Sequence, residues 1–406
     1  MSDELMHNRV PVFVNRTEGY ACYRIPSIVR MGNNDLLAVC EGRLANCGDH
    51  DGVIRVVAKI SQDNGLTWGA LFELARNVIA DGSEHVAQNP CPVVDMLDPA
   101  HPQGKIIIVY NKTEYGERKI TEGFGVRRVY TIESVDHGRT WSDERDITDQ
   151  VHKALNPTYT AVYADADQRY ADPADWRLNF PATGHAVQLR GGLANRAATR
   201  GRLFVAAKVT IGDAPVAGGQ NCVYWSDDHG ASWQIGGVSA VRGFDEAMAV
   251  ELEDGSVMVN FRNNTGPDGA RIKKRGVMFH HFDDHGRLIL AAEHHDDDGL
   301  PDPSVQGSIH RYSWSDEAET GSRSRILFSN PNSTVERENM TVRLSYDEGR
   351  SWSVSRVIDD HAGAYSDLVV TGDQRIGVLY ERGNAGGIHF AVFTLEWLTG
   401  GSDGVP

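Results

Sequence analysis

The sequence lacks the features of several protein classes. It has no run of about 18 consecutive apolar residues, so no membrane-spanning helix is predicted. Its start, MSDELMHNRV, has no apolar stretch of the kind found in signal peptides. No export signal is visible, and we leave localisation open between a cytoplasmic protein and one whose signal this stretch does not include.

Cysteine is also scarce. The five cysteines are odd in number, lie far apart and never occur as C-x-x-C, which predicts free thiols and argues against a zinc site. No calcium loop of the EF-hand spacing is present either, so we predict no metal and no cofactor. The cysteines are Cys22, Cys40, Cys47, Cys91 and Cys222.

Basic residues are fewer than acidic residues. There are 40 Lys and Arg residues against 56 Asp and Glu residues, which gives a formal net charge of −16. This balance argues against nucleic acid or an anionic surface as a partner. An anionic substrate would require positive charge to be concentrated locally.

What the sequence does have is an octet of the form Ser-x-Asp-x-Gly-x-[Thr/Ser]-Trp, repeated four times. Its Asp can accept hydrogen bonds from backbone N–H groups, its Gly can take a positive φ, and its Trp supplies a large apolar group beneath a turn. Such repeats predict an array of sheets. The copies are SQDNGLTW (61–68), SVDHGRTW (134–141), SDDHGASW (226–233) and SYDEGRSW (345–352), with a degenerate fifth at 281–288.

Strand-like segments surround these octets in a regular order. Six pairs of such segments occur, for example DLLAVCEGR (35–43) and VIRVVAKIS (53–61), and most follow a third segment such as GHAVQL (184–189). The pattern predicts an all-β fold, a six-bladed β-propeller of four-stranded antiparallel blades. Stacked sandwiches are the alternative, but they do not explain why the octet follows the third strand of a unit. We expect one catalytic propeller domain over residues 1–406, with the propeller at about 10–398, and a monomer.

Strand direction then sorts residues between two faces. In a meander, the start of strand 1 and the end of strand 2 share one face, and the turn after strand 3 lies on the other. The octets are therefore predicted to lie away from the first face. That first face gathers four arginines, three carboxylates and a tyrosine: Arg24, Arg43, Arg262, Arg337, Glu246, Glu381, Asp49 and Tyr365.

These residues lie in motifs that resemble those of the sialidase (neuraminidase) superfamily, and the octets resemble its Asp boxes. The resemblance runs from about residue 10 to 398, in the family's order, and is greatest to non-viral exo-sialidases that consist of a catalytic propeller alone. The motifs are YRIP (23–26), EGR-x5-GD (41–49), NPCPV (89–93), DEAMAVEL (245–252), MVNFR (258–262), NP-x5-R-x-N (330–339), AYSDL (364–368) and LYERG (379–383).

The resemblance assigns a carboxylate-binding triad to Arg24, Arg262 and Arg337. Sialic acids carry a carboxylate on the anomeric carbon, and planar, permanently charged guanidinium groups bind carboxylates in a fork. Glu381 resembles the residue that orients Arg24. Any one of these arginines alone could equally form a surface ion pair.

Two further residues are assigned to the sugar pocket by resemblance. Arg43 resembles an arginine near the acid, although it could also be a simple charge at a strand end. Asn89 stands where many bacterial members have an acidic residue, which weakens the inference about its contact with the sugar.

The resemblance assigns the nucleophile to Tyr365 and its base to Glu246. A carboxylate attacking a centre that already bears a carboxylate would meet repulsion, whereas a neutral phenol beside a base would not, and sialidases use a tyrosine in this role. Asp49 resembles the acid that protonates the leaving oxygen. Asp51 in the same loop is the alternative.

The function implied by the resemblance is a retaining exo-α-sialidase acting on sialylated oligosaccharides, glycoproteins or glycolipids. A hydrolase of a related 2-keto-3-deoxy-nonulosonate glycoside would need the same arginines. A non-catalytic propeller would be expected to lose Tyr365, Glu246 or Asp49. The long aromatic segment 154–180 either shapes the side of the site that holds the leaving group or is a packed surface loop.

Overall fold

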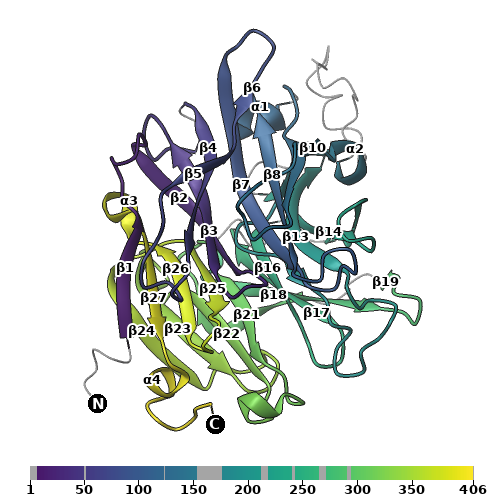
Figure 1. Ribbon diagram of the computed structural model, residues 1–406, viewed down its shortest axis with the longest axis vertical. Coiled ribbons are helices and arrows are strands. Elements are labelled where there is room, and N and C mark those ends of the chain that lie inside the picture. The colour runs from purple at the N-terminus through teal and green to yellow at the C-terminus, as the bar shows by residue number, and fades with distance from the viewer. Residues whose placement is uncertain are drawn as a thin grey trace.

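A computed structural model shows antiparallel sheets set around a common centre (Figure 1). Within the part of the chain that it describes, no helix has the length and apolar character to cross a membrane. The structure describes residues 7–49, 52–122, 124–152, 176–211, 218–239, 243–264, 271–289 and 294–405.

One four-stranded sheet joins the two ends of the chain. Strand β1 pairs antiparallel with β27, from His7 opposite Phe393 to Phe13 opposite Ile388, so the N-terminal strand is the outer strand of the last blade. The sheet has the order β1 (His7–Phe13), β27 (Ile388–Phe393), β26 (Ile376–Glu381) and β25 (Ser366–Val370).

The largest sheet has nine strands and contains two successive meanders. A single parallel bridge between Ile54 and Val86 joins them, because β4 and β7 approach at that point. The strands are β2 (Cys22–Arg30), β3 (Leu36–Arg43), β4 (Ile54–Ser61), β5 (Phe72–Ala75), β6 (Asn77–Val78), β7 (Glu84–Asp95), β8 (Lys105–Thr113), β9 (Arg128–Ser134) and β10 (Arg145–Asp146).

Three more sheets are single blades of four strands, two of them with one extra strand. The first has β11 (Trp176–Pro181), β12 (Val187–Gln188), β13 (Leu203–Ile211), β14 (Gln220–Ser226) and β15 (Gln234–Gly236). The second has β16 (Phe244–Glu251), β17 (Val257–Asn263), β18 (Lys274–Phe282), β19 (Leu288–Ile289) and β20 (His294–Pro301). The third has β21 (Ser308–Ser313), β22 (Arg325–Pro331), β23 (Glu338–Ser345) and β24 (Val354–Ala362).

Helices are few and short in the described residues and lie in loops or at the C-terminal end. They are α1 (Glu117–Thr121), α2 (Thr148–Val151), the 3-10 helix η4 (Ala318–Thr320), α3 (Gly383–Gly386) and α4 (Leu395–Thr399). The fold is therefore all-β, as predicted.

The innermost strands of successive meanders contact one another and close a ring, which makes the fold a β-propeller. The prediction of six separate blades is wrong for the hydrogen-bonded sheets of the described residues, which form four separate blades and one nine-stranded sheet. The bridge at Ile54 and Val86 is the reason. Apolar side chains fill the space between neighbouring sheets, so the core is a series of layers around the ring.

Each octet forms the same turn. In the first copy, Asp63 accepts hydrogen bonds from the backbone N–H of Thr67 at 2.8 Å and from its hydroxyl at 2.6 Å. The Oγ of Ser61 accepts from the N–H of Gly65, which has φ +88°. The other three complete copies repeat these bonds.

The octets also join neighbouring sheets. A Cβ on Gly65 would lie 2.0 Å from the ring of Phe390 on β27, and Trp68 packs edge-on against the same ring with centroids 5.6 Å apart. A glycine is therefore needed at this position for two reasons: it adopts the positive φ, and it leaves room for the ring of the neighbouring blade. The Trp, which was predicted to pack beneath its own turn, also packs against the neighbouring blade.

Strand register places the octets opposite the arginine face. Arg43 at one end of β3 pairs with Ile54, whereas Leu36 at the other end pairs with Ser61, where the first octet begins. The two ends of this ladder are about 23 Å apart at the rise of an extended strand. The face assignment predicted from strand direction is confirmed for this blade.

We expect Asp136→Ala, in the second octet, to lower the free energy of unfolding by about 0.5–2 kcal/mol, because it removes the acceptor for the Thr140 N–H and hydroxyl. Asp228→Ala in the third octet should lower the free energy of unfolding by a similar amount. Urea unfolding measures the loss, with Asp143→Ala at an exposed position as the control. A changed KM or pH optimum in the folded variant would contradict the assignment of the octets to the far face.

Cys22 and Cys47 form a disulfide, so the prediction of free thiols is wrong for this pair. The pairing of β2 with β3 brings Cys22 opposite Arg43, and the loop after β3 then returns to the start of β2. Cys40, Cys91 and Cys222 are buried free thiols. The disulfide anchors the loop that carries Asp49.

Candidate active site

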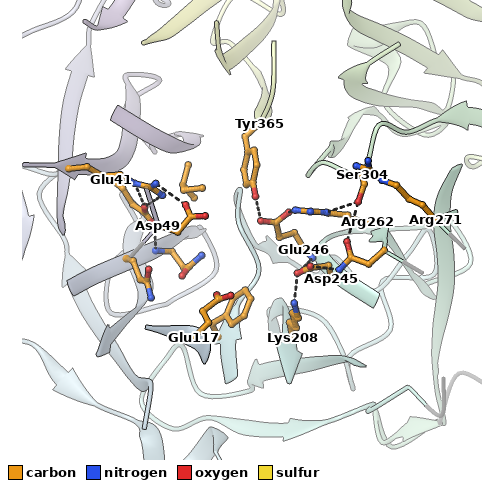
Figure 2. A pocket seen from close by; sticks show the side chains of 16 residues that line it. Glu41, Asp49, Glu117, Lys208, Asp245, Glu246, Arg262, Arg271, Ser304 and Tyr365 are labelled. Carbon is orange, nitrogen blue, oxygen red and sulfur yellow. Dashed lines mark hydrogen bonds and ion pairs between the residues drawn. The ribbon is translucent and has the colours of Figure 1, made fainter. Parts of the chain in front are cut away.

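A cavity of about 490 Å³ opens on the arginine face and collects the predicted residues (Figure 2). Six of the nine line it directly, and the remaining three, Arg24, Arg337 and Glu381, lie beside Tyr365. All nine predicted residues are therefore brought together. The six lining residues are Arg43, Asp49, Asn89, Glu246, Arg262 and Tyr365.

Tyr365 and Glu246 are directly hydrogen-bonded in the centre of the cavity (Figure 2). The phenol oxygen of Tyr365 donates to Oε1 of Glu246, and Nη1 of Arg262 donates to Oε2 at 2.9 Å. Both side chains are buried, with Tyr365 6% and Glu246 8% exposed. Because both carboxylate oxygens are occupied, the orientation of Glu246 toward the phenol is fixed.

The protonation of this pair follows from its surroundings. Burial, followed by the nearby Glu246 carboxylate, holds the pKa of Tyr365 well above its ordinary value. Burial also raises the pKa of Glu246; Arg262 opposes this and Asp245 adds to it. The phenol is therefore neutral until a base removes its proton, and Glu246 is the group in contact with that proton.

The YRIP segment holds an unusual backbone conformation that aims Arg24 at the tyrosine. Ile25 has φ +59°, a costly value for a β-branched residue. Oε1 of Glu381 accepts from Ile25 N at 2.9 Å and from Arg24 Nε at 2.7 Å, which stabilises this conformation. The Arg24 guanidinium then lies 5.2 Å from the centroid of the Tyr365 ring.

Arg24 stays charged although only 12% of its side chain is exposed. Burial lowers the pKa of Arg24, but Glu381, then Tyr365 and Asp49 outweigh that effect and leave the pKa above its ordinary value. Arg337 approaches the same tyrosine ring, with its guanidinium 6.0 Å from the centroid. Together with Arg262, these groups surround the phenol with positive charge.

Asp49 lies at the exposed edge of the cavity, with 62% of its side chain accessible. Its Oδ1 accepts from Arg43 Nη1 at 2.7 Å and lies 4.0 Å from Arg24 Nη1. Arg43 is in turn held by Glu41, whose Oε2 accepts from Nε at 3.0 Å and from Nη2 at 2.6 Å. Asp51, the alternative acid, lies outside the described residues.

Asn89 contributes an acceptor that is free to meet a ligand. Its backbone has φ +53°, and its N–H donates to Oε1 of Glu41 at 2.9 Å. Its side-chain oxygen is buried at the cavity wall and has no hydrogen-bond partner in the described residues. A buried acceptor without a hydrogen bond lowers the stability of the fold unless a ligand or solvent donor pairs with it.

The sequence interpretation missed Asp245 and Lys208, which line the cavity beside the base. Asp245 Oδ1 accepts from Lys208 Nζ at 2.7 Å and from the backbone N–H of Glu246 at 3.0 Å. Adjacent strand residues normally point to opposite faces. A register shift between Phe244 and Ala247 on β16 brings both acids to the cavity, and strand alternation gives no signal of it.

Asp245→Asn is expected to shift the acidic limb of kcat/KM to lower pH, by about one pH unit. Burial raises the pKa of Asp245, but Lys208 and Arg262 outweigh it and bring the pKa below its ordinary value, so Asp245 is ionised. Its charge raises the pKa of Glu246, and removing it should let Glu246 ionise at lower pH. A pH profile of kcat/KM measures this.

The substitution Asp143→Asn is the control for that profile, since it removes the same charge at an exposed position outside the cavity lining. An unchanged limb, or one that moves to higher pH, would contradict the electrostatic role of Asp245.

Two side-chain groups of the described residues have the composition of a metal site, and neither lines the cavity. In each, a basic side chain forms an ion pair with one of the acids: Lys105 is 2.9 Å from Asp98, and Arg9 is 2.7 Å from Asp359. The groups are Asp95, Asp98 and His229, and Asp359, Asp360 and His361.

Comparison with known proteins finds that the family of BNR repeat-like domains matches residues 34–378. A sialidase of Micromonospora viridifaciens is 32% identical over 411 residues, which cover 98% of this chain and 55% of that protein. An exo-alpha-sialidase of Aspergillus fumigatus is 26% identical, covering 94% and 86%. The chain thus spans little more than half of the Micromonospora protein.

Solved structures share the fold. A Hadza microbial sialidase superposes with a TM-score of 0.74 at 22% identity, covering 94% of this chain and 67% of that one. An intramolecular trans-sialidase from Ruminococcus gnavus, in complex with oseltamivir carboxylate, gives 0.72 at 15% identity, covering 96% and 98%. These likenesses concern the propeller itself.

Proposed function

The chain belongs to the sialidase superfamily, and we propose that it is a retaining exo-α-sialidase. Its substrates would be oligosaccharides, glycoproteins or glycolipids that end in an α-linked sialic acid. Residues 1–406 would act as one catalytic propeller, with the reaction in the cavity around Tyr365.

The observation that supports this proposal most directly is the hydrogen bond from Tyr365 to Glu246. Tyr365 directly precedes β25 and Glu246 lies on β16, so two separate blades bring a buried phenol and a buried carboxylate together. A phenol that delivers its proton to a carboxylate becomes a nucleophile without presenting a negative charge to an anionic substrate beforehand.

In the first step, the Tyr365 oxygen attacks the anomeric carbon as its proton passes to Glu246. The bond to the leaving oxygen breaks, and Asp49 supplies the proton that oxygen needs. The position of Asp49 at the exposed edge suits this role, because the leaving group must extend toward solvent. The product of this step is a sugar joined to the tyrosine.

In the second step, Asp49 takes a proton from water, and the water oxygen attacks the same carbon. The bond to the Tyr365 oxygen breaks, and Glu246 returns the proton to the phenol. Two displacements at one carbon restore its original configuration.

The arginines serve the substrate's carboxylate. Arg24, Arg262 and Arg337 would bind it, and their charge would also draw an anion toward a protein of net charge −16. Arg43 would hold Asp49 in place, as its 2.7 Å contact indicates. Asn89 would offer its unpaired oxygen to a donor group of the sugar.

The test is a panel of aryl α-glycosides of N-acetylneuraminic acid, N-glycolylneuraminic acid and the deaminated sugar, assayed with one preparation. Release of the aryl alcohol with free sialic acid supports the proposal. Preference for the deaminated sugar would point to the related nonulosonate hydrolase. Release with only an anhydro sugar would indicate intramolecular transfer, and no release from any glycoside would overturn the proposal.

A further inference from the structure

Ser304 contacts two of the cavity arginines through two different atoms. It lies in the loop between β20 and β21 and is 3% exposed. Its side-chain Oγ accepts from Arg262 Nε at 3.2 Å (Figure 2). Its backbone oxygen accepts from Arg337 Nη2 at 3.1 Å. One residue therefore hydrogen-bonds two guanidinium groups that come from separate blades.

The loop around Ser304 is held rigidly. Ser304 has φ +62°, which is uncommon for a residue with a side chain. Asp302 accepts from Val305 N at 3.0 Å and from the fully buried Arg275 at 3.2 Å, so the loop is fixed on either side of the serine. A strained conformation that its neighbours enforce is typical of a functional position.

The hydroxyl of Ser304 also links the arginines to the acids beside Tyr365. It donates a hydrogen bond to Oδ1 of Asn264 at 3.1 Å. Asn264 Nδ2 in turn donates to Asp245 Oδ2 at 2.6 Å. Asp245 in turn accepts from the backbone of Glu246. The chain of bonds runs without a gap from Arg262 to the strand that carries Glu246.

We propose that Ser304 is a positioning residue for the carboxylate of the substrate, because its side chain holds Arg262 and its backbone oxygen holds Arg337, two of the three arginines proposed to bind that carboxylate. This inference rests on the proposed function and adds to it a residue outside the motifs of the sequence. Without the hydroxyl, Arg262 keeps its contact with Glu246 but loses the bond that orients its Nε edge.

The experiment measures binding of 2-deoxy-2,3-dehydro-N-acetylneuraminic acid by calorimetry to the parent protein, Ser304→Ala and Ser304→Gly. The glycine variant tolerates φ +62°, so it keeps the test valid if the alanine variant does not fold. We expect both variants to bind about tenfold more weakly, since a hydrogen bond to a charged group is lost. Ser322→Ala, an exposed serine at φ +51° away from the cavity lining, is the matched control and should bind as the parent does.

A double-mutant cycle separates positioning from a merely structural effect. If Ser304 acts through Arg262, then Ser304→Ala should change binding by less than about twofold in an Arg262→Lys background, which lacks the Nε donor. Binding of the single variants within about twofold of the parent, or a full tenfold loss in the lysine background as well, would overturn the inference. A parent protein that does not bind the acid would overturn the proposed function together with it.

Discussion

Replacing Tyr365 with phenylalanine is expected to lower kcat by about a thousandfold or more for a substrate with a poor leaving group. The change removes one oxygen and leaves the ring that Arg24 and Arg337 approach, so no large cavity forms. Without the phenol oxygen, no sugar–tyrosine bond can form, and Glu246 has no proton to take from it. Steady-state kinetics on an alkyl α-sialoside measure the loss.

Tyr346→Phe is the matched control for that variant. It removes a hydroxyl that donates to Asp403 at 2.8 Å near the C-terminal end, and neither Tyr346 nor Asp403 lines the cavity. It should cost some stability and leave kcat near that of the parent. Retention of more than about a tenth of the parent kcat by a folded Tyr365→Phe protein would rule out Tyr365 as the nucleophile.

Replacing Arg337 with alanine is expected to weaken binding of the substrate's carboxylate by about 2–5 kcal/mol, the cost of truncating one partner of a desolvated charge pair. Arg337 is the cleaner choice than Arg262, because Arg262 also holds Glu246 and its loss would disturb the base. Binding of the dehydro acid measures the effect. Arg337→Lys keeps the charge but loses the fork and should fall between the parent and the alanine variant.

An arginine on the far face provides the control. Arg139→Ala removes the same charge from the exposed second octet and should leave binding unchanged at moderate salt. Binding of Arg337→Ala within about threefold of the parent would contradict the assignment of Arg337 to the carboxylate.

Motifs and strand alternation predicted much of this molecule. The octets were found as turns because Asp, Gly and Trp each have one suitable place in such a turn. Strand direction then predicted which face holds Arg43 and Arg262, because the end of the second strand of a meander always lies on the same face as the start of the first. For these positions, the local sequence alone determines the turn and the face on which each residue lies.

Other features depend on contacts between distant segments and could not be predicted. The bond of Cys22 to Cys47 requires the loop after β3 to return to β2, and spacing alone gives no sign of it. The exposure of Asp245 to the cavity depends on a register shift in β16 that no pattern of apolar residues reveals. Asn89 and Ser304 reach their positions through a positive φ that only the surrounding bonds maintain.

Strand pairing corrected two further predictions. The segment GHAVQL (184–189) was predicted as a strand-like segment, but only Val187 and Gln188 of it form a strand, β12, and β11 pairs with β13 alongside it. Of the segment 154–180, residues 176–180 belong to β11, and residues 153–175 lie outside the described residues. A single bridge at Ile54 merged two predicted blades into one sheet.

Proton NMR of the sugar as it is first released, recorded before mutarotation, tests the sugar–tyrosine intermediate most directly. If Tyr365 and water attack in turn, the first product from the unsubstituted enzyme must be the α-anomer, the configuration of the substrate. A first product in the β configuration would mean a single displacement by water, and Tyr365 would then not be the nucleophile.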